Sequence, residues 1–194
     1  YHTTLDDYFS AKVRLFSEIL MPKGIAVLNK EDRYFEVLSS AAVARGAAVL
    51  SYGREGKDIR LLDIRPETNG QQIDMLIGGV KRSVRLPLIG GFQALNVLCA
   101  LGIIIASGGN SEKAVEHLES LQGVRGRAEL ATRLNNGATV YIDYAHTPDA
   151  LKQLLISMRP HTEKNLNLVF GCGGDRDSGK RAEMGAIAHS LADN

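Results

Sequence analysis

Apolar and polar positions follow two different periods along the chain, and these periods separate helical from extended segments. Residues 5–20 place apolar side chains on one stripe at helical spacing, with two acids in the first turn, and predict a helix. The apolar run that starts at Gly24, the helical pattern of 34–45 and the apolar run of 47–52 predict a strand, a helix and a strand. This order is a βαβ unit.

From Asp58 to Leu88 the pattern changes to short alternating runs separated by Asn-Gly and Gly-Gly pairs. Such pairs close tight turns, so we expect antiparallel hairpins at a sheet edge or in a side sheet. Two helices follow: a glycine-opened, buried one (GGFQALNVLCALGIIIASG) and an amphipathic one (NSEKAVEHLESL) capped by Asn110 or Ser111.

A second series of strands and helices begins near residue 125. It comprises strands at 128–133 and 139–143, a helix at 148–158, a buried strand at 165–172 (NLNLVFGC) and a helix at 181–191. A new series of this kind needs its own parallel sheet. We therefore expect a domain boundary between residues 124 and 125, with an α/β fold on both sides of it.

Composition and charge narrow the functional classes. Lysine and arginine total 23 against 22 for aspartate and glutamate, so no basic field points to nucleic acid. The two cysteines, Cys99 and Cys172, lack the spacing of a zinc site and indicate a reducing, cytoplasmic setting. The longest apolar stretch, Ala94–Ala106, is shorter than the roughly 20 residues of a membrane span, so no membrane partner is expected.

Lys12 lies within the apolar stripe of the first helix, at the spacing of its buried positions. Spacing alone favours a snorkelling side chain, whose stem covers apolar surface while the ammonium stays in water. The alternative is chemical, because an amine in a partly apolar pocket loses its proton easily and a neutral amine adds carbon dioxide. The resulting carbamate would bind a metal ion as a carboxylate does.

Polar residues near strand and helix ends are further candidates. Asp143 and His146 stand in DYAHTPDA, where a strand ends and a helix begins. Ligands of open α/β sheets collect at such ends, so these two residues are candidates for binding, and a well-made helix cap explains the pattern equally well. Arg127 in GVRGRAEL is a candidate for a phosphate, and the amides of Gln93 and Asn96 for an anion or a base.

The stretch VFGCGGDRDSGKR has nearly the spacing of a phosphate-binding loop. From Gly174 it reads Gly, four residues, Gly179 and Lys180, but Arg181 stands where a serine or threonine should bring a hydroxyl to magnesium. Two acids inside the loop would also repel phosphates. The stretch is therefore a poor match to such a loop.

Five segments, in their order along the chain, resemble the Mur ligases: YHTTLDDYFSAKVRLF, GGFQALN, GRAEL, DYAHTPDAL and VFGCGGDRDSGKR. The resemblance spans almost the whole chain and is strongest to the type that adds the third amino acid to the peptidoglycan precursor. It implies an α/β fold in which the latter part of a P-loop-type central ATPase domain (1–124) is followed by the beginning of a Rossmann-like C-terminal domain (125–194).

The same resemblance implies an activity. It implies an ATP-dependent ligase that joins meso-diaminopimelate or L-lysine to UDP-MurNAc-L-Ala-D-Glu through an acyl phosphate, in peptidoglycan synthesis and hence in cell shape and division. Its cofactors would be ATP and Mg²⁺. Its partners would be the UDP-MurNAc-dipeptide and a free amino acid, and it would act as a cytoplasmic monomer.

The resemblance also assigns roles to residues by their position in the motifs. Lys12 resembles the carbamoylated lysine that helps to hold magnesium, and Asn96 resembles the amide that contacts adenine. Arg127 resembles the arginine that reaches the nucleotide phosphates. Asp143 would lie at the ribose, and His146 beside the nucleotide.

Arg176, in VFGCGGDRDSGKR, resembles the arginine associated with the carboxylate of the incoming amino acid. This would place the loop on the amino-acid side of the site. The family's P-loop and the histidine for its second magnesium are expected upstream of Tyr1, and its specificity motif beyond Asn194. The isolated 194 residues are therefore expected to show no ligase turnover.

Two other interpretations stay open. One is a catalytically silent α/β nucleotide-binding or scaffold module, in which the same caps and turns are structural. The other is a sister ligase that extends a folate or cyanophycin-like substrate, although DYAHTPDAL followed by GCGGDRD points away from folate. A carbamate on Lys12 distinguishes the ligase from the silent module.

Overall fold

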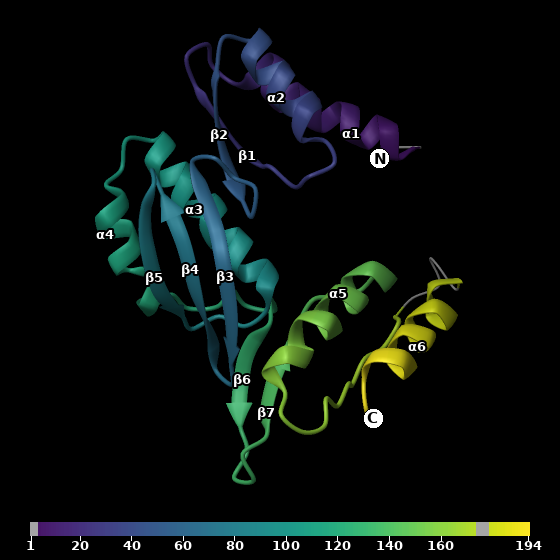
Figure 1. The fold of residues 1–194 in the computed structure, drawn as a ribbon. Coiled ribbons are helices and arrows are strands. Elements are labelled where there is room, and N and C mark those ends of the chain that lie inside the picture. Colours follow the sequence, from purple (N-terminus) through teal and green to yellow (C-terminus); the bar gives the residue numbers. More distant parts are fainter. Residues whose placement is uncertain (1–3, 174–178) are drawn as a thin grey trace. The chain divides into compact units, whose positions relative to one another are not determined.

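The computed structural model describes residues 4–173 and 179–194, which form two compact units. The first unit comprises the residues up to Asp63, Ile73–Val84 and Leu95–His117, and the second comprises Ile64–Gln72, Arg85–Ala94 and Leu118–Asn194. Each unit contains both helices and strands (Figure 1), which confirms the predicted α/β class.

The first helix begins at a cap and changes its winding halfway. In α1 (Leu5–Arg14) the Thr4 hydroxyl accepts a hydrogen bond from the Asp7 N–H, which satisfies one of the unpaired donors of the first turn. In η1 (Leu15–Ile19) the backbone bonds widen to the i→i+5 pattern of a π-helix. The predicted helix is therefore present, but its second half is not a regular α-helix.

The predicted apolar stripe of this helix is not the face that it buries. Tyr8, Leu15 and Ile19 remain 47%, 51% and 65% exposed, whereas Phe16 and Leu20 pack against the core of the first unit. The wider π-turn rotates the residues that follow α1 relative to a regular helix. After Arg14 the spacing of the stripe consequently no longer selects the buried face, whereas the exposure of Tyr8, within α1, does not depend on this turn.

A βαβ unit follows, as predicted. β1 (Ile25–Asn29) pairs in parallel with β2 (Ala48–Gly53), and α2 (Phe35–Ala44) connects the two strands. The buried side chains that they share are Ala26, Leu28, Phe35, Ala42 and Ala47. Removal of these apolar surfaces from water is the main force that holds the helix on the two strands.

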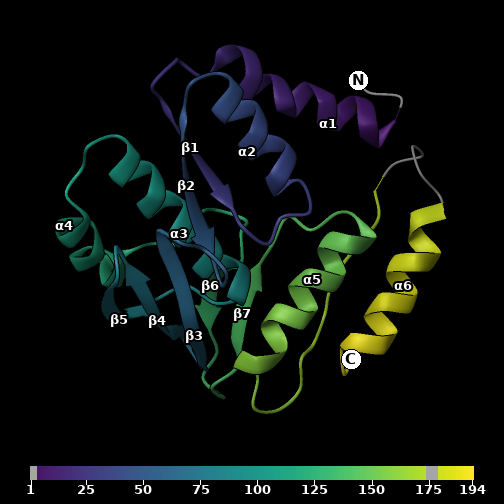
Figure 2. The same cartoon turned by 45° about the horizontal axis from the view of Figure 1, so that its top comes forward.

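The sheet continues from the βαβ unit into two hairpins. Its strand order is β1-β2-β3-β4-β5, with β3 (Ile59–Glu67) parallel to β2. Links of two residues separate β3 from β4 (Gly70–Ile77) and β4 from β5 (Val80–Leu86), so these neighbours are antiparallel, as predicted. The hairpins extend one mixed sheet (Figure 2) instead of forming a side sheet.

Helix α3 (Gly91–Ala106) packs closely on this sheet, and two short helices follow it, α4 (Ser111–Glu116) and η2 (Leu118–Ser120). A Cβ at Gly102 would lie 2.7 Å from Val27 Cγ1, so the close approach requires glycine. The Asn110 side chain accepts from the Lys113 N–H, which identifies Asn110 as the cap of α4.

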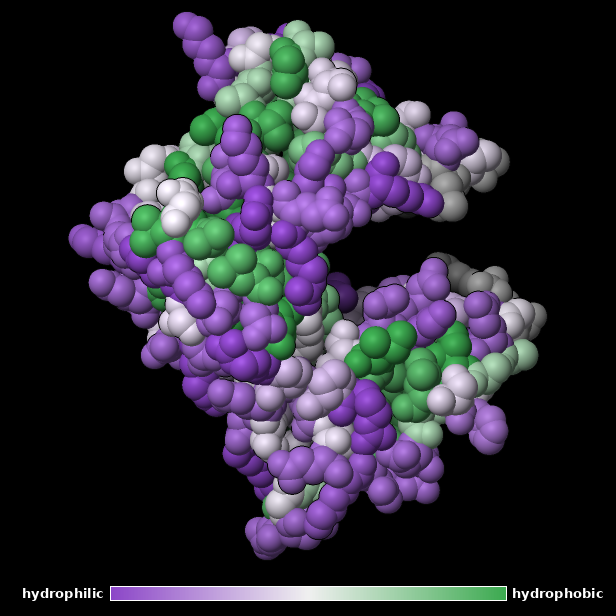
Figure 3. Space-filling model, in the orientation of Figure 1, coloured by the Kyte–Doolittle hydropathy of each residue, from purple (hydrophilic) through white to green (hydrophobic). Residues whose placement is uncertain are grey.

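The second unit contains β6 (Glu129–Arg133), β7 (Thr139–Ile142), α5 (Pro148–Met158), η3 (Arg159–His161) and α6 (Gly179–Leu191). β6 and β7 form an antiparallel pair, and α5 and α6 lie side by side (Figures 1 and 2). The core of the second unit includes Leu151, Leu155 and Met184. Other apolar side chains reach the surface over α5 and toward α6 (Figure 3).

The predicted buried strand at 165–172 is wrong. Leu166 is buried, but Val169 and Phe170 are 99% and 42% exposed, and the segment forms no strand. A strand exists only through a ladder of hydrogen bonds to a neighbour. Among the described residues, this segment pairs with the chain end through Leu168 N–H to Asn194 O and Asp193 N–H to Leu166 O, which is too short a run for a ladder.

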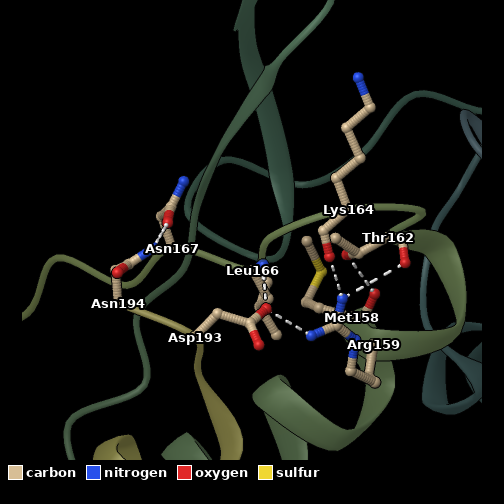
Figure 4. Close-up of polar contacts among 8 residues, drawn as sticks. All are labelled: Met158, Arg159, Thr162, Lys164, Leu166, Asn167, Asp193 and Asn194. Atoms are coloured by element: carbon tan, nitrogen blue, oxygen red, sulfur yellow. Dashed lines mark hydrogen bonds and ion pairs between the residues drawn. The ribbon is translucent and has the colours of Figure 1, made fainter.

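A cluster of polar contacts around Asp193 joins residues 193–194 to the segment after α5 (Figure 4). The Asp193 carboxylate accepts from the Leu166 N–H and from Arg159 Nη1, each at 2.7 Å. Arg159 Nη2 also donates to the carbonyls of Thr162 and Lys164. The Leu166 N–H first, and then Arg159, lower the pKa of Asp193 below its usual value of 3.8.

This cluster predicts a pH dependence of stability. Since folding lowers the pKa of Asp193, its contribution is present in full above the unfolded-state pKa and is lost as pH falls through the folded-state pKa. In the full-length protein, Asp193→Asn is therefore expected to lower the melting temperature at pH 7, and the difference from the wild type should shrink below about pH 4. The control is Glu163→Gln, at an exposed residue outside the cluster. A difference that stays constant down to pH 3 would contradict this role.

Candidate functional site

The turn that carries Arg127 is fixed through its backbone. The Arg127 N–H donates to Val124 O at 3.0 Å, and the Tyr144 N–H donates to Gly126 O at 2.8 Å. Gly126 has a φ of 67°, the left-handed conformation that glycine adopts most easily. Ala128 has a φ of 49°, which is uncommon for a residue with a Cβ. The turn thus combines an uncommon backbone conformation at Ala128 with backbone hydrogen bonds at Gly126 and Arg127.

Asp143 holds the turn from β7. Its two carboxylate oxygens accept from the Ala128 N–H and from the Ala145 N–H, both at 2.8 Å, and its side chain is partly buried. A carboxylate has about four acceptor positions, so these two bonds leave capacity for a hydroxyl of a ligand. The structure therefore gives Asp143 a clamping role, and its predicted contact with a ribose stays a prediction.

Two further side chains complete the clamp, and sequence reasoning did not assign this role to either. Glu129 Oε2 accepts from the Gly126 N–H at 2.8 Å, and the buried Gln93 donates from Nε2 to Arg127 O at 3.4 Å. The role of Glu129 could have been predicted from the sequence, because an acid three residues after a glycine can accept a hydrogen bond from the N–H of that glycine. The role of Gln93 could not, because its partner Arg127 is distant in sequence.

The Arg127 side chain is exposed and lies beside the Tyr144 ring. Its guanidinium carbon is 5.7 Å from the centroid of the Tyr144 ring, and the His146 ring is 4.9 Å from the same ring. His146 Nδ1 is 3.0 Å from Tyr144 O. The structure thus places Arg127, Asp143 and His146 in one small region, and an exposed guanidinium beside an aromatic ring can bind an anion that carries a planar group.

His161 ties the start of α3 to this unit. The Gly90 N–H donates to His161 Nε2 at 2.9 Å, so this nitrogen is unprotonated. His161 Nδ1 lies 2.8 Å from Glu67 O and donates to it. The neutral imidazole therefore joins the end of β3, the residue before α3 and η3, and this keeps Gln93 near the Arg127 turn.

Lys12 and Asn96 belong to the first unit. Lys12 is exposed, and its Nζ lies 4.4 Å from the centroid of the Tyr8 ring. The partly apolar pocket considered for Lys12 is therefore not formed by the described residues. Asn96 is exposed on α3, about one turn after Gln93. Arg176 and the loop residues 174–178 lie outside the described residues.

A hollow of about 1030 Å³ lies in the second unit, between β7 and residues 161–170. Leu151, Leu155 and Met158 of α5 line one wall, and these residues belong to the core of the unit. Burial raises the pKa of Tyr141, which also lines it. Polar residues, among them Asp143, His161 and Lys164, line the rest of the hollow.

Over residues 4–173 and 179–194, no helix combines the length and the apolar character that crossing a membrane would require. The same residues contain no group of three or more His, Cys, Asp or Glu side chains placed to hold a metal ion.

Comparison with known proteins gives a consistent pattern. Residues 1–104 match the family described as "Mur ligase middle domain", and residues 126–194 match "Mur ligase, glutamate ligase domain". UDP-N-acetylmuramoyl-L-alanyl-D-glutamate--2,6-diaminopimelate ligases of Zymomonas mobilis and Caulobacter vibrioides are 45% and 46% identical to the chain over its whole length. The chain spans 40% of the length of each.

A solved structure of a ligase with the same name is 31% identical to the chain, with a TM-score of 0.74. The match covers 99% of this chain and 39% of the solved one. The similarity in sequence and the similarity in fold thus extend over the same residues.

Proposed function

Because the chain belongs to the Mur ligase family, we propose that the full-length protein is an ATP-dependent ligase that joins 2,6-diaminopimelate to UDP-N-acetylmuramoyl-L-alanyl-D-glutamate. The observation that carries the proposal is the 45% identity, over all 194 residues, to a ligase named for these substrates. The chain would supply the later part of the ATP-binding domain (1–124) and the start of the C-terminal domain (125–194). The reaction would take place in the cytoplasm.

The chemistry of such a ligase has two steps. A carboxylate oxygen of the acceptor attacks the γ-phosphorus of ATP, and ADP leaves. The neutral amine of the amino acid then attacks the acyl carbon, and phosphate leaves with the oxygen that came from the carboxylate. Both steps develop negative charge on oxygens, so fixed positive groups near these oxygens accelerate the reaction.

Arg127 is the residue of this chain best placed to supply such a charge. Its backbone is clamped, its guanidinium is exposed, and a guanidinium can bind two phosphate oxygens at once. Asp143, with acceptor capacity left, would receive a ribose hydroxyl, and His146 would lie beside the nucleotide. Asn96 would contact the adenine, and Arg176 would bind the carboxylate of the amino acid.

The family also implies magnesium, and one residue of this chain fits it. Magnesium in proteins is usually held by one or two carboxylates together with phosphates and water. As a carbamate, Lys12 would supply one such ligand, and its exposed amine leaves room for carbon dioxide to add. Magnesium bound there would neutralise charge on the phosphoryl oxygens. The contact that the structure gives Lys12 is with the Tyr8 ring, so its role as a metal ligand rests on the resemblance.

Substrate-dependent ADP release by the full-length protein tests this proposal. ADP should form only when ATP, the UDP-MurNAc-dipeptide and diaminopimelate are all present. Replacing the dipeptide substrate by a folate should give none. ADP release that does not depend on the amino acid would refute the ligase assignment and favour a nucleotide-binding module.

A further inference from the structure

We propose that Glu129 is a positioning residue, which holds the turn Gly126–Ala128 in the conformation that presents Arg127 to phosphate. The inference rests on the nucleotide role proposed above for Arg127. Glu129 would not touch the nucleotide. It would act through its hydrogen bond to the Gly126 N–H, at 2.8 Å.

Hydrogen bonds fix the backbone of this turn. Gly126 N–H, Gly126 O, Arg127 N–H, Arg127 O and Ala128 N–H all take part in hydrogen bonds. Their partners come from Val124, the start of α3, β6 and the residues after β7. So many fixed groups leave the exposed Arg127 side chain as the part of the turn that is directed outward. The fold therefore fixes the position of the Arg127 backbone, from which the guanidinium extends.

The backbone of this turn is also strained at Ala128. Ala128 keeps a φ of 49°, a conformation that a residue with a Cβ rarely adopts. Such conformations persist only where surrounding contacts enforce them, and they gather at functional sites. Asp143 holds the N–H of Ala128, and Glu129 holds the N–H two residues earlier, so the turn is fixed at the strained residue and at its start.

The charge of Glu129 supports the same role. A carboxylate near a phosphate site repels the ligand, so an acid there is unfavourable unless it makes a stabilising interaction. The hydrogen bond gives one, because a bond from an N–H to a charged acceptor is stronger than one to a neutral acceptor. Without this hydrogen bond, Gly126 would sample more conformations in the free protein. The entropy lost when nucleotide orders the turn would then lower the affinity for nucleotide.

The test is a double-mutant cycle in the full-length protein, with the KM for ATP and kcat measured separately. Glu129→Ala is expected to raise the KM for ATP about tenfold with little change in kcat, since it loses one charge-assisted bond that orders the turn. In an Arg127→Ala background the same change should leave the KM for ATP unaltered, because Glu129 acts only through Arg127. The control is Glu183→Ala, at an exposed residue of α6.

Glu129→Gln covers the case in which the alanine variant does not fold. It keeps an acceptor oxygen and loses the charge, so the KM for ATP should rise by about threefold, and again not in the Arg127→Ala background. An unchanged KM in both variants, or effects that add in the double variants, would overturn the proposal. If Arg127→Ala itself leaves the KM for ATP unchanged, the role of Arg127 fails first, and the single variants show which of the two ideas was wrong.

Discussion

Replacing Lys12 by alanine in the full-length protein is expected to lower ligase turnover by about 10²–10³-fold. The reason is the loss of one anionic ligand for the magnesium that would neutralise the phosphoryl oxygens. Folding should be little affected, because Lys12 is exposed and its described contact is with the Tyr8 ring. The measurement is kcat for substrate-dependent ADP release.

Three controls separate a carbamate from a positive charge at this position. Lys12→Arg keeps the charge and cannot form a carbamate, so it should be as inactive as the alanine variant. Acetate or formate should restore part of the activity of Lys12→Ala, because a short carboxylate can take the place of the carbamate. Arg14→Ala, on the same helix, removes an exposed ion pair with Glu18 and should leave kcat unchanged. Full activity of Lys12→Arg would show that no carbamate is needed.

Arg127→Ala is expected to lower kcat/KM for ATP by about 10²–10³-fold, mainly through a higher KM for ATP, because a guanidinium that binds two phosphate oxygens at once is lost. The turn itself should survive, since its hydrogen bonds involve the backbone of residue 127 and not its side chain. Arg127→Lys should recover only part of the loss, because an ammonium cannot bind two oxygens in one plane.

The matched control for Arg127 is Arg133→Ala, an exposed arginine at the end of β6. It should change kcat/KM for ATP by less than about twofold, because surface charges outside the site have small effects. Equal losses of kcat/KM for ATP in the two variants would mean that the reaction depends on the overall positive charge of the surface and not on the position of Arg127 in the turn.

Much of the fold follows from local pattern. The βαβ unit, the two hairpins after Asp58 and the capped helix that starts at Pro148 were all predicted from periodicity, turn pairs and caps. Each of these depends on neighbours in sequence. The Thr147 hydroxyl, for example, accepts from the Ala150 N–H only three residues away.

What could not be predicted depends on partners that are distant in sequence. The apolar residues of 165–172 indicate a strand, but a strand also needs a neighbouring strand to hydrogen-bond with. This segment has only a short backbone pairing with residues 193 and 194. The spacing around Lys12 indicates a buried stripe, and the π-turn after it turns another face toward the core. Likewise, the sequence offers Asp143 as a ligand contact and gives no sign that it clamps Ala128, 15 residues earlier.

The central claim is that the protein activates a carboxylate by phosphorylation. Its most direct test uses the UDP-MurNAc-dipeptide with ¹⁸O in the terminal carboxylate, together with ATP, diaminopimelate and the full-length protein. Mass spectrometry of the released phosphate should find a carboxylate-derived ¹⁸O atom in it, because the leaving phosphate retains the oxygen that attacked ATP. Phosphate that carries oxygen from solvent water and none from the carboxylate would contradict the account.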